Sequence, residues 1–346
     1  MKPPYSIIDP RCMTEYDKLV LNCPDYTFFH SSAWAKVLSE SYGYHPAYVA
    51  VINKGTFEFL LPLMEINSHF TGKRAVALPF SDFCGPLMAG SGWYESLLPF
   101  LKEQGKVSDW DYIEIRGGEN IFSDFNPSVS YLTHEIDLSE NMDGLQSGFR
   151  SSTRRNINKA VSNGLKIELL NSENAVGIFY RLNCQTRKKH GLPPQPFSFF
   201  KSIHTHIVSK NGGMIALASR KSEYVAGALF LHFGEKAIYK YGASDPNHAD
   251  LRANYLIFNE VIKWYSEQGF KSLHFGRTSS DNEGLRQFKT GWGVKEMLTR
   301  YYKYDLQREK FITDRQKENG FYNKIFRNIP VPVSVFIGSK LYKHVG

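Results

Sequence analysis

The stretch MIALASRKSEYVAGALFL, from Met214 to Leu231, decides the fold class. Its apolar residues flank a polar break at 220–223, which predicts two strands joined by a tight turn. The earlier stretch AYVAVINKGTFEFLLPL, from Ala47 to Leu63, has the same form, with its break at Asn53–Gly55. Each half of the chain is therefore predicted to form a β-hairpin.

The elements that follow each hairpin also match, in the order strand, loop, helix, strand. A hairpin followed by a strand–helix–strand crossover predicts a mixed sheet flanked by helices, which is an α/β unit. Because the order repeats, we predict an internal duplication. The elements are Arg74–Pro79, Ser81–Gly92, Tyr94–Glu103 and Tyr112–Arg116 in the first half, and Ala237–Tyr241, Gly242–Asp250, Leu251–Glu267 and His274–Gly276 in the second.

The length of 346 residues suits two domains, each with its own core. A basic helix at about Gly148–Ser162 is expected to bridge them. We place the first domain at 1–147, the second at 148–306 and a basic, apolar tail at 307–346. For this tail, two alternatives stay open: docking on the second domain, or contact with an anionic membrane face.

The composition excludes several classes of protein. The four cysteines are scattered without a C-x-x-C pair, so we expect neither a disulfide framework nor a metal site. No apolar stretch approaches the ~20 residues of a membrane span, and the N-terminus lacks the pattern of a signal peptide. We therefore expect a cytoplasmic protein, or one that lies peripherally at the inner membrane face.

The net charge of +8 is concentrated in two places. Residues 150–166 contain five basic side chains and no acidic one, and the tail is also basic. Such clustering predicts a polyanionic partner such as phosphates, RNA or an anionic membrane. The alternative is a pair of solvated helix faces.

Several motifs together resemble the FemAB-like family. They are Trp34, Tyr42–Pro46, Leu61–Leu63, Leu78–Phe83 with Gly85-Pro86, Arg154–Ala160 with Gly164, and Phe275–Arg277 followed by GLRQFKTGWG at Gly284–Gly293. The similarity reaches to about residue 305. The long helical arm of the family's peptidoglycan branch has no counterpart here.

The resemblance implies tandem acetyltransferase-like (GNAT) domains, each a mixed sheet flanked by helices. It also implies transfer of an acyl or aminoacyl group onto an amino group of a cell-envelope or polysaccharide precursor. The expected co-substrate is aminoacyl-tRNA or acyl-CoA, with no tightly bound cofactor. The expected acceptor is an anionic envelope or glycan precursor. The alternatives are an acyl-CoA-dependent N-acyltransferase, and a degenerate GNAT pair that only binds RNA or glycan.

Acyl transfer to an amine needs a proton acceptor, stabilisation of an oxyanion and alignment of both substrates. We expect Lys289, in a glycine-bounded loop, to project into a cleft between the domains and supply the cation. The resemblance gives the matching lysine this role; the alternative is a solvated surface lysine. Asp82, between Pro79 and Pro86, could bind the acceptor ammonium or take its proton, and the alternative is a turn.

Further residues are expected to hold substrate, each with a structural alternative. Arg277 could clamp a phosphate or carboxylate, or pair with Asp281 or Glu283. The remaining candidates are Arg150, Arg154 and Arg155 with Lys159 on the basic helix, Arg252 before the central helix of the second domain, Tyr239 and Tyr241 on a strand, and the pair Glu114 and Arg116, which is expected at the surface.

Overall fold

The computed structural model describes residues 5–88, 94–313 and 320–346. Their contacts divide the chain into two compact units. Unit 1 is Met1–Tyr131, Leu298–Gln316 and Leu341–Gly346, and unit 2 is Leu132–Met297 and Lys317–Lys340. This division is not linear, whereas our domain boundary at 147/148 assumed consecutive segments. It follows long-range contacts, which the sequence pattern does not reveal.

Unit 1 contains the first predicted hairpin and crossover. The hairpin strands are β3 (Tyr48–Asn53) and β4 (Thr56–Leu61), which pair antiparallel. After Pro62 the chain enters a second group of strands, in which β6 (Gly72–Val76) and β8 (Tyr112–Arg116) pair in parallel. The other elements are β1 (Ser6–Ile8), α1 (Tyr16–Leu21), α2 (Ser32–Tyr42), β2 (His45–Pro46), β5 (Met64–Ser68), β7 (Leu87–Met88), α3 (Tyr94–Ser108), α4 (Glu119–Phe122), most of β15 (Lys295–Asp305) and β16 (Lys310–Ile312).

The crossover of unit 1 runs from β6 through α3 to β8, as the sequence predicted. Apolar residues from these elements share one core with the hairpin, which explains why they fold together. The members include Phe59, Leu61, Ala75, Leu97, Leu101, Ile113 and Ile115. The predicted loop 81–92 extends into residues outside the described part of the chain.

Unit 2 is a mixed sheet with the strand order β10-β11-β12-β13-β14-β9. The second predicted hairpin is β11 (Gly213–Arg220) and β12 (Glu223–Phe233), with Arg220 opposite Glu223. The remaining strands are β10 (Lys166–Leu170), β13 (Lys236–Ser244), β14 (Ser272–Thr278) and β9 (Val129–Asp137), which begins in unit 1.

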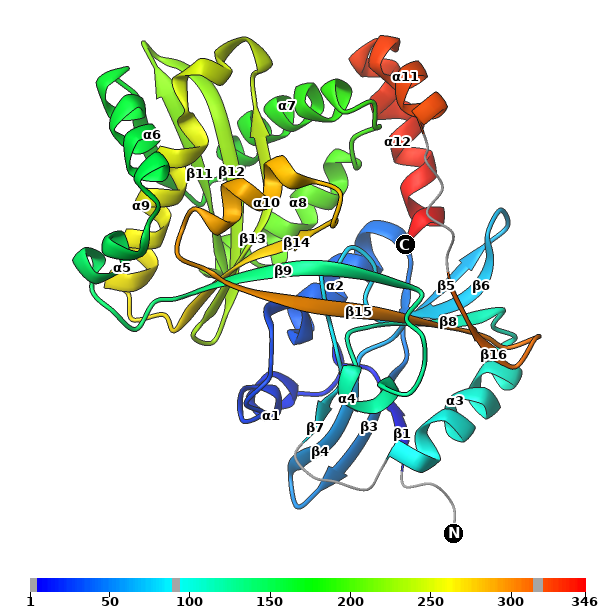
Figure 1. Cartoon of the computed structure of the whole chain (residues 1–346). Helices are drawn as coiled ribbons and strands as arrows, with labels where there is room; N and C mark the ends of the chain where they lie inside the picture. Colours follow the sequence, from blue (N-terminus) through cyan, green and yellow to red (C-terminus); the bar gives the residue numbers. More distant parts are fainter. Residues whose placement is uncertain (1–4, 89–93, 314–319) are drawn as a thin grey trace. The chain divides into compact units, whose positions relative to one another are not determined.

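Helices cover both faces of this sheet (Figure 1). One face carries α9 (Ala253–Glu267) and α6 (Ser151–Ser162), and the other carries α7 (Glu173–Lys189) and α8 (Phe197–His206). This is the layered mixed sheet that the sequence predicted. The other helices are α5 (Met142–Gly148), the short 3₁₀ segment η3 (Pro246–Leu251), α10 (Glu283–Thr290), α11 (Gly320–Asn328) and α12 (Val331–Val345), which ends in unit 1.

The parallel pair of unit 2 diverges. β13 pairs with β14 at Lys236–Ile238 and Ser272–His274, although β13 continues to Ser244 and β14 to Thr278. Ligands in open α/β sheets bind outside the carboxyl ends of such strands. The diverging ends of β13 and β14 are therefore a candidate place for a ligand.

Candidate functional site

The end of β14 is kinked at Gly276. This glycine has a φ of 73°, a left-handed conformation that suits glycine. The pairing of β14 with β9 shifts register between His274 and Arg277. Within the kink, Nδ1 of buried His274 accepts a hydrogen bond from the Gly276 N–H at 2.9 Å. The pairing with β9 resumes at Arg277, which lies opposite Thr133.

Lys289 binds these two carbonyl groups. Its Nζ donates to the oxygen of Gly276 and to that of Arg277, at 3.0 Å each, and the residue is only 2% exposed. Two of our expectations are corrected here. Lys289 lies in the last turn of helix α10 instead of a loop, and burial excludes the solvated alternative. Carbonyl groups are neutral dipoles, so these two contacts hold the ammonium without neutralising it.

His134 on β9 lies close enough to Lys289 for the lysine charge to lower its pKa. His134 is fully buried, and its Nε2 contacts Oε2 of Glu296 at 2.9 Å. Arg286 on α10 donates to both oxygens of Glu296, at 2.8 and 2.6 Å. Burial lowers the pKa of His134 and the Lys289 charge lowers it further, whereas the hydrogen bond that His134 donates to Glu296 raises it. The neutral ring therefore carries its proton on Nε2, because the carboxylate is only an acceptor.

The sequence GWG after Lys289 fixes the start of the basic helix. The carbonyl of Gly291 accepts from Thr153 Oγ1 and from the Arg150 N–H, both at 2.9 Å. Trp292 is buried between aromatic rings of the unit 2 core, and Gly293 has a φ of 70°. A Cβ on Gly293 would lie 3.1 Å from the Gly148 carbonyl oxygen. This motif thus locks α10 against the junction of α5 and α6.

The three arginines of the basic segment have different surroundings. Arg150 is the N-cap residue of α6 and lies outside the helix, so only part of the predicted double basic row is helical. Arg154 donates to the carbonyl groups of Gln146 and Phe149, at 3.1 and 2.7 Å, and so caps the end of α5. Arg155 and Lys159 are exposed on α6.

A β-bulge separates the two candidate tyrosines of β13. The register shifts between Leu229/Phe230 on β12, so Tyr239 and Tyr241 fall on opposite faces although they are two residues apart. Tyr239 packs on Phe258 of α9, and Tyr241 packs on Phe200 of α8. The two tyrosines therefore face different helices and do not line one surface together.

Arg252 begins helix α9. It has a φ of 60° and a ψ of 28°, and α9 lacks a side-chain cap at this end. The exposed Arg252 side chain and the first free N–H groups of α9 lie at one place in the chain, after β13. Arg252 therefore takes the left-handed backbone conformation that glycine adopts most easily.

Asp82 belongs to unit 1, in the loop after β6. Its backbone carbonyl accepts from Tyr301 Oη at 2.6 Å. The same loop is held by Arg116, whose Nη1 donates to the carbonyl groups of Leu78 and Ser81 at 3.2 and 3.4 Å. Arg116 also pairs with Glu114 at 2.8 Å, and the two side chains are only 12% and 16% exposed. The pair is therefore half-buried, whereas we had expected it at the surface.

Metal-ligand geometry is not found among the described residues, where no group of three or more His, Cys, Asp or Glu side chains could hold an ion. Cys84 Sγ lies 3.7 Å from Nε2 of His30, but this nitrogen is also 2.9 Å from the Gly85 carbonyl oxygen. Burial raises the pKa of the Cys84 thiol. The pair is a structural contact.

The sequence prediction missed His134, Glu296 and Arg286. Arg286 lies within the motif Gly284–Gly293 but was not singled out, His134 and Glu296 lie in none of the motifs, and the proximity of the three arises from the pairing of distant segments. Lys289 and Arg277, both predicted, are brought together through the Arg277 carbonyl. Asp82 belongs to the other unit.

Comparisons with known proteins fit this geometry. Residues 147–290 match the family model of the acetyltransferase (GNAT) domain. A stretch of 77 residues is 37% identical to the lipid II:glycine glycyltransferase of Staphylococcus haemolyticus, covering 20% of this chain and 18% of that protein. The chain therefore aligns with less than a fifth of that relative's length.

Two solved structures share the fold over most of the chain. FemX matches with a TM-score of 0.68 at 18% identity, covering 85% of this chain and 96% of FemX. A tandem GNAT protein from the clavulanic acid biosynthesis pathway matches with a TM-score of 0.55 at 10% identity, covering 87% of this chain and 98% of that one. These matches agree with the tandem GNAT-type fold that the sequence predicted, and residues 147–290 carry the sequence pattern of an acetyltransferase (GNAT) domain.

Proposed function

We propose that this protein transfers an acyl or aminoacyl group from an activated donor to an amino group of a cell-envelope precursor. The glycyltransferase name of the sequence relative and the GNAT domain support this function. The observation that carries it is the buried Lys289 ammonium at the kinked carboxyl end of β14. A fixed cation there stabilises negative charge on a carbonyl oxygen during transfer.

The other candidate residues support parts of the same reaction. Arg252 and the uncapped start of α9 suit a donor phosphate, because a helix N-terminus attracts anions. Arg277, beside the kink, would orient a carboxylate or phosphate, and Arg150 and Arg155 would attract a polyanionic donor or acceptor. We keep Asp82 as a proposed contact of the acceptor amine and Tyr241 as a proposed substrate contact on the α8 face.

The identity of the donor is tested by supplying the two classes of donor, aminoacyl-tRNA and acyl-CoA, separately. The purified protein is incubated with radiolabelled aminoacyl-tRNA or with acetyl-CoA, together with an extract of envelope precursors, and transfer into precursor is counted. The proposal expects label in precursor from one donor, and a loss on the order of 10²–10³-fold for Lys289→Met. Absence of transfer from both donors contradicts it. An equally active Lys289→Met variant removes the assigned role of Lys289.

We also propose that the tail of unit 2 touches an anionic membrane surface. Gly338 of α12 packs closely on the Pro194 carbonyl, so one side of the tail is docked. Its other side exposes Ile325, Val333 and Phe336, the last at 64%, next to exposed basic residues. Those are Lys324, Arg327 and Lys340. Exposed apolar residues among basic ones favour an anionic interface.

Sedimentation with vesicles tests this contact. We expect binding to vesicles that contain anionic lipid, and reduced binding for Val333→Ser combined with Phe336→Ser. Val161→Ser on α6, an equally exposed apolar site, is the control. Equal sedimentation of all three proteins would rule out the contact. No described helix is long and apolar enough to cross a bilayer.

A further inference from the structure

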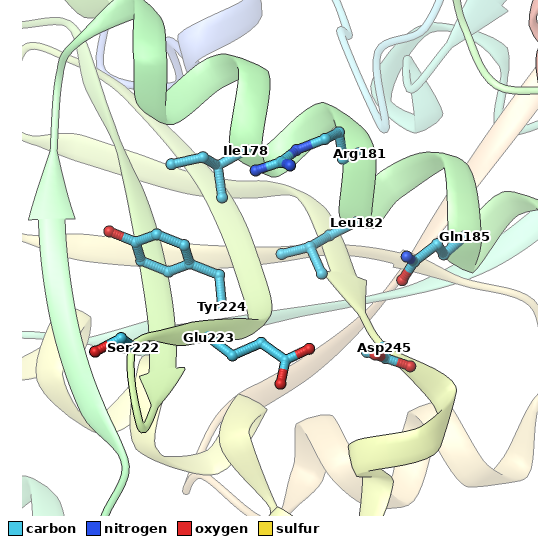
Figure 2. Close-up of a pocket in the computed structure, with 8 residues that line it drawn as sticks. All are labelled: Ile178, Arg181, Leu182, Gln185, Ser222, Glu223, Tyr224 and Asp245. Atoms are coloured by element: carbon cyan, nitrogen blue, oxygen red, sulfur yellow. The ribbon is translucent and has the colours of Figure 1, made fainter.

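A cavity of about 310 Å³ lies in unit 2 between α7 and the β11–β12 hairpin (Figure 2). Helix α7 contributes Ile178, Arg181, Leu182 and Gln185 to one wall. The hairpin and the end of β13 contribute the opposite wall, with Ser222, Glu223, Tyr224 and Asp245. None of these residues belongs to the Lys289 cluster described above.

The two walls carry opposite charges. Arg181 lies on the α7 wall, whereas Glu223 and Asp245 lie across from it (Figure 2). The side chains of Arg181 and Glu223 form no hydrogen bond or ion pair with another described residue. Asp245 accepts from the Asn247 N–H at 2.9 Å through Oδ1, and its Oδ2 lies 3.2 Å from Nδ1 of His248, so both contacts fix the carboxylate. A guanidinium and two carboxylates thus stand around one cavity without pairing to each other.

The hairpin that carries Glu223 is held in a costly conformation. Lys221 and Ser222, the two turn residues, have φ values of 49° and 67°. Turns of this kind favour glycine or asparagine, and the matching turn of unit 1 does use Gly55. Left-handed backbone costs roughly 1–2 kcal/mol per residue without glycine. Strain of this kind collects at ligand sites, and here it sets the position of Ser222 and Glu223 at the cavity.

The floor between the charges is apolar. Ile178 and Leu182 are 9% and 6% exposed, and the ring of Tyr224 stands beside them. Tyr224 is held by a hydrogen bond from its hydroxyl to Glu168 at 3.0 Å. An apolar floor with few convergent charged groups is typical of small-molecule sites, and the volume lies at the small end of their range of ~300–1,000 Å³.

We propose that this cavity binds a small zwitterion, with its carboxylate on Arg181, its ammonium between Glu223 and Asp245, and an apolar side chain on Ile178 and Leu182. Free α-amino acids and short peptides share this chemistry. The inference is independent of the proposed acyl transfer, because it uses no residue of the Lys289 site.

A neighbouring cavity offers a way to distinguish a free amino acid from a short peptide. It measures about 570 Å³, shares Gln185 and Asp245 with the first, and adds Lys188, Lys189 and Arg327. A peptide that extends from the first cavity would place a backbone carbonyl on Arg181 and its carboxylate among these three cations. A free amino acid would fill the first cavity alone.

Binding of L-leucine and of trialanine to the full chain, measured by titration calorimetry, tests the proposal. We expect saturable binding of at least one probe, weakened about 10–100-fold by Arg181→Gln and by Glu223→Gln, the range for a lost hydrogen bond to a charged group. Lys210→Gln and Glu173→Gln remove exposed charges outside both cavities and serve as matched controls. Both targeted side chains are exposed, so we expect the variants to fold, and thermal melting checks this.

The outcomes separate clearly. Binding of trialanine that Lys188→Gln with Lys189→Gln also weakens identifies a peptide site, whereas binding of leucine alone identifies an amino-acid site. The proposal is overturned if neither probe binds saturably up to about 10 mM, a Kd beyond which the free energy of binding falls below ~3 kcal/mol. It is equally overturned if Arg181→Gln and Glu223→Gln bind like the controls.

Discussion

In unit 1 the loop after β6 is tied by Arg116, whereas in unit 2 the end of β14 is tied by Lys289. Both cations donate to backbone carbonyl groups at the carboxyl end of a parallel strand pair. Arg116 also has the Glu114 carboxylate at 2.8 Å, which compensates its charge. Two hydrogen bonds of Lys289 go to neutral carbonyl groups. The comparison shows that Arg116 ties its loop through an ion pair and carbonyl contacts, whereas Lys289 ties the kinked end of β14 to the last turn of α10.

The loop in unit 1 shows what its cation stabilises. Leu78 and Phe80 have φ values of 48° and 60°, which are unfavourable for bulky side chains. Ser81 Oγ donates to the Leu78 carbonyl at 2.6 Å, and Arg116 donates to the same oxygen. The strained loop persists because several hydrogen bonds determine it.

The largest expected effect is therefore on the stability of unit 1. Arg116→Met removes the cation that pairs with Glu114 and one donor to each of two loop carbonyl groups, and a lost hydrogen bond to a charged group costs about 1.5–3 kcal/mol. We expect a loss of this size, about 1.5–3 kcal/mol, in the free energy of unfolding measured with urea. Arg155→Met, which removes an exposed arginine, should change stability by less than ~0.5 kcal/mol. A loss below ~1 kcal/mol for Arg116→Met would contradict a structural role.

An intermediate effect is expected at the segment that holds α10 in place. Gly293→Ala forces an alanine into a left-handed conformation near the Gly148 carbonyl, at a cost of roughly 1–2 kcal/mol. Gly284, within α10, is the control, since a Cβ there meets nothing within 4 Å. Gly284→Ala should stabilise by up to ~1 kcal/mol because alanine favours helix. Equal effects of the two substitutions would show that Gly293 is not a conformational requirement.

The smallest expected effect is a pH dependence in unit 2. The pKa of buried His134 is lowered, so the unfolded chain binds a proton more readily than the folded one. Stability should fall as the pH drops below the usual histidine value of about 6.5, by up to ~1.4 kcal/mol per unit of pKa difference. The charged groups facing His134 are Glu296 on β15, with Arg286 and Lys289 on α10.

This dependence is measured by denaturant unfolding between pH 5 and 8, the range in which histidine titrates. His134→Gln should flatten the curve. Burial also lowers the pKa of His232. The variant His232→Gln therefore shows how much a second histidine contributes to the same pH dependence. An unchanged slope in His134→Gln would mean that His134 does not titrate as proposed.

The sequence predicted the elements that depend on local pattern. Both hairpins, both crossovers and the helix at about 148–162 are present, because alternation and helix periodicity are local properties. Helix α10 was not predicted, although Asn282 caps it by accepting from the Leu285 N–H at 3.1 Å. Its glycine at 284 and its length of 8 residues hid the helical period.

The features that depend on distant contacts could not be predicted. The bulge that separates Tyr239 from Tyr241 has no marker in the sequence, and one extra residue reverses which face a side chain occupies. His134 and Glu296 are 162 residues apart, so only tertiary structure makes them neighbours. Lys289 was predicted as a functional residue through the resemblance, but its burial came from the structure.

The most direct test concerns Lys289 in the cell. Envelope precursors are isolated from cells that lack the gene and carry either the wild-type protein, Lys289→Met or Lys289→Arg, and their intact masses are compared. At equal protein levels, wild type should add a mass increment that Lys289→Met loses and Lys289→Arg retains in part, because arginine keeps the charge. An undiminished increment with Lys289→Met would contradict the central role of this buried ammonium.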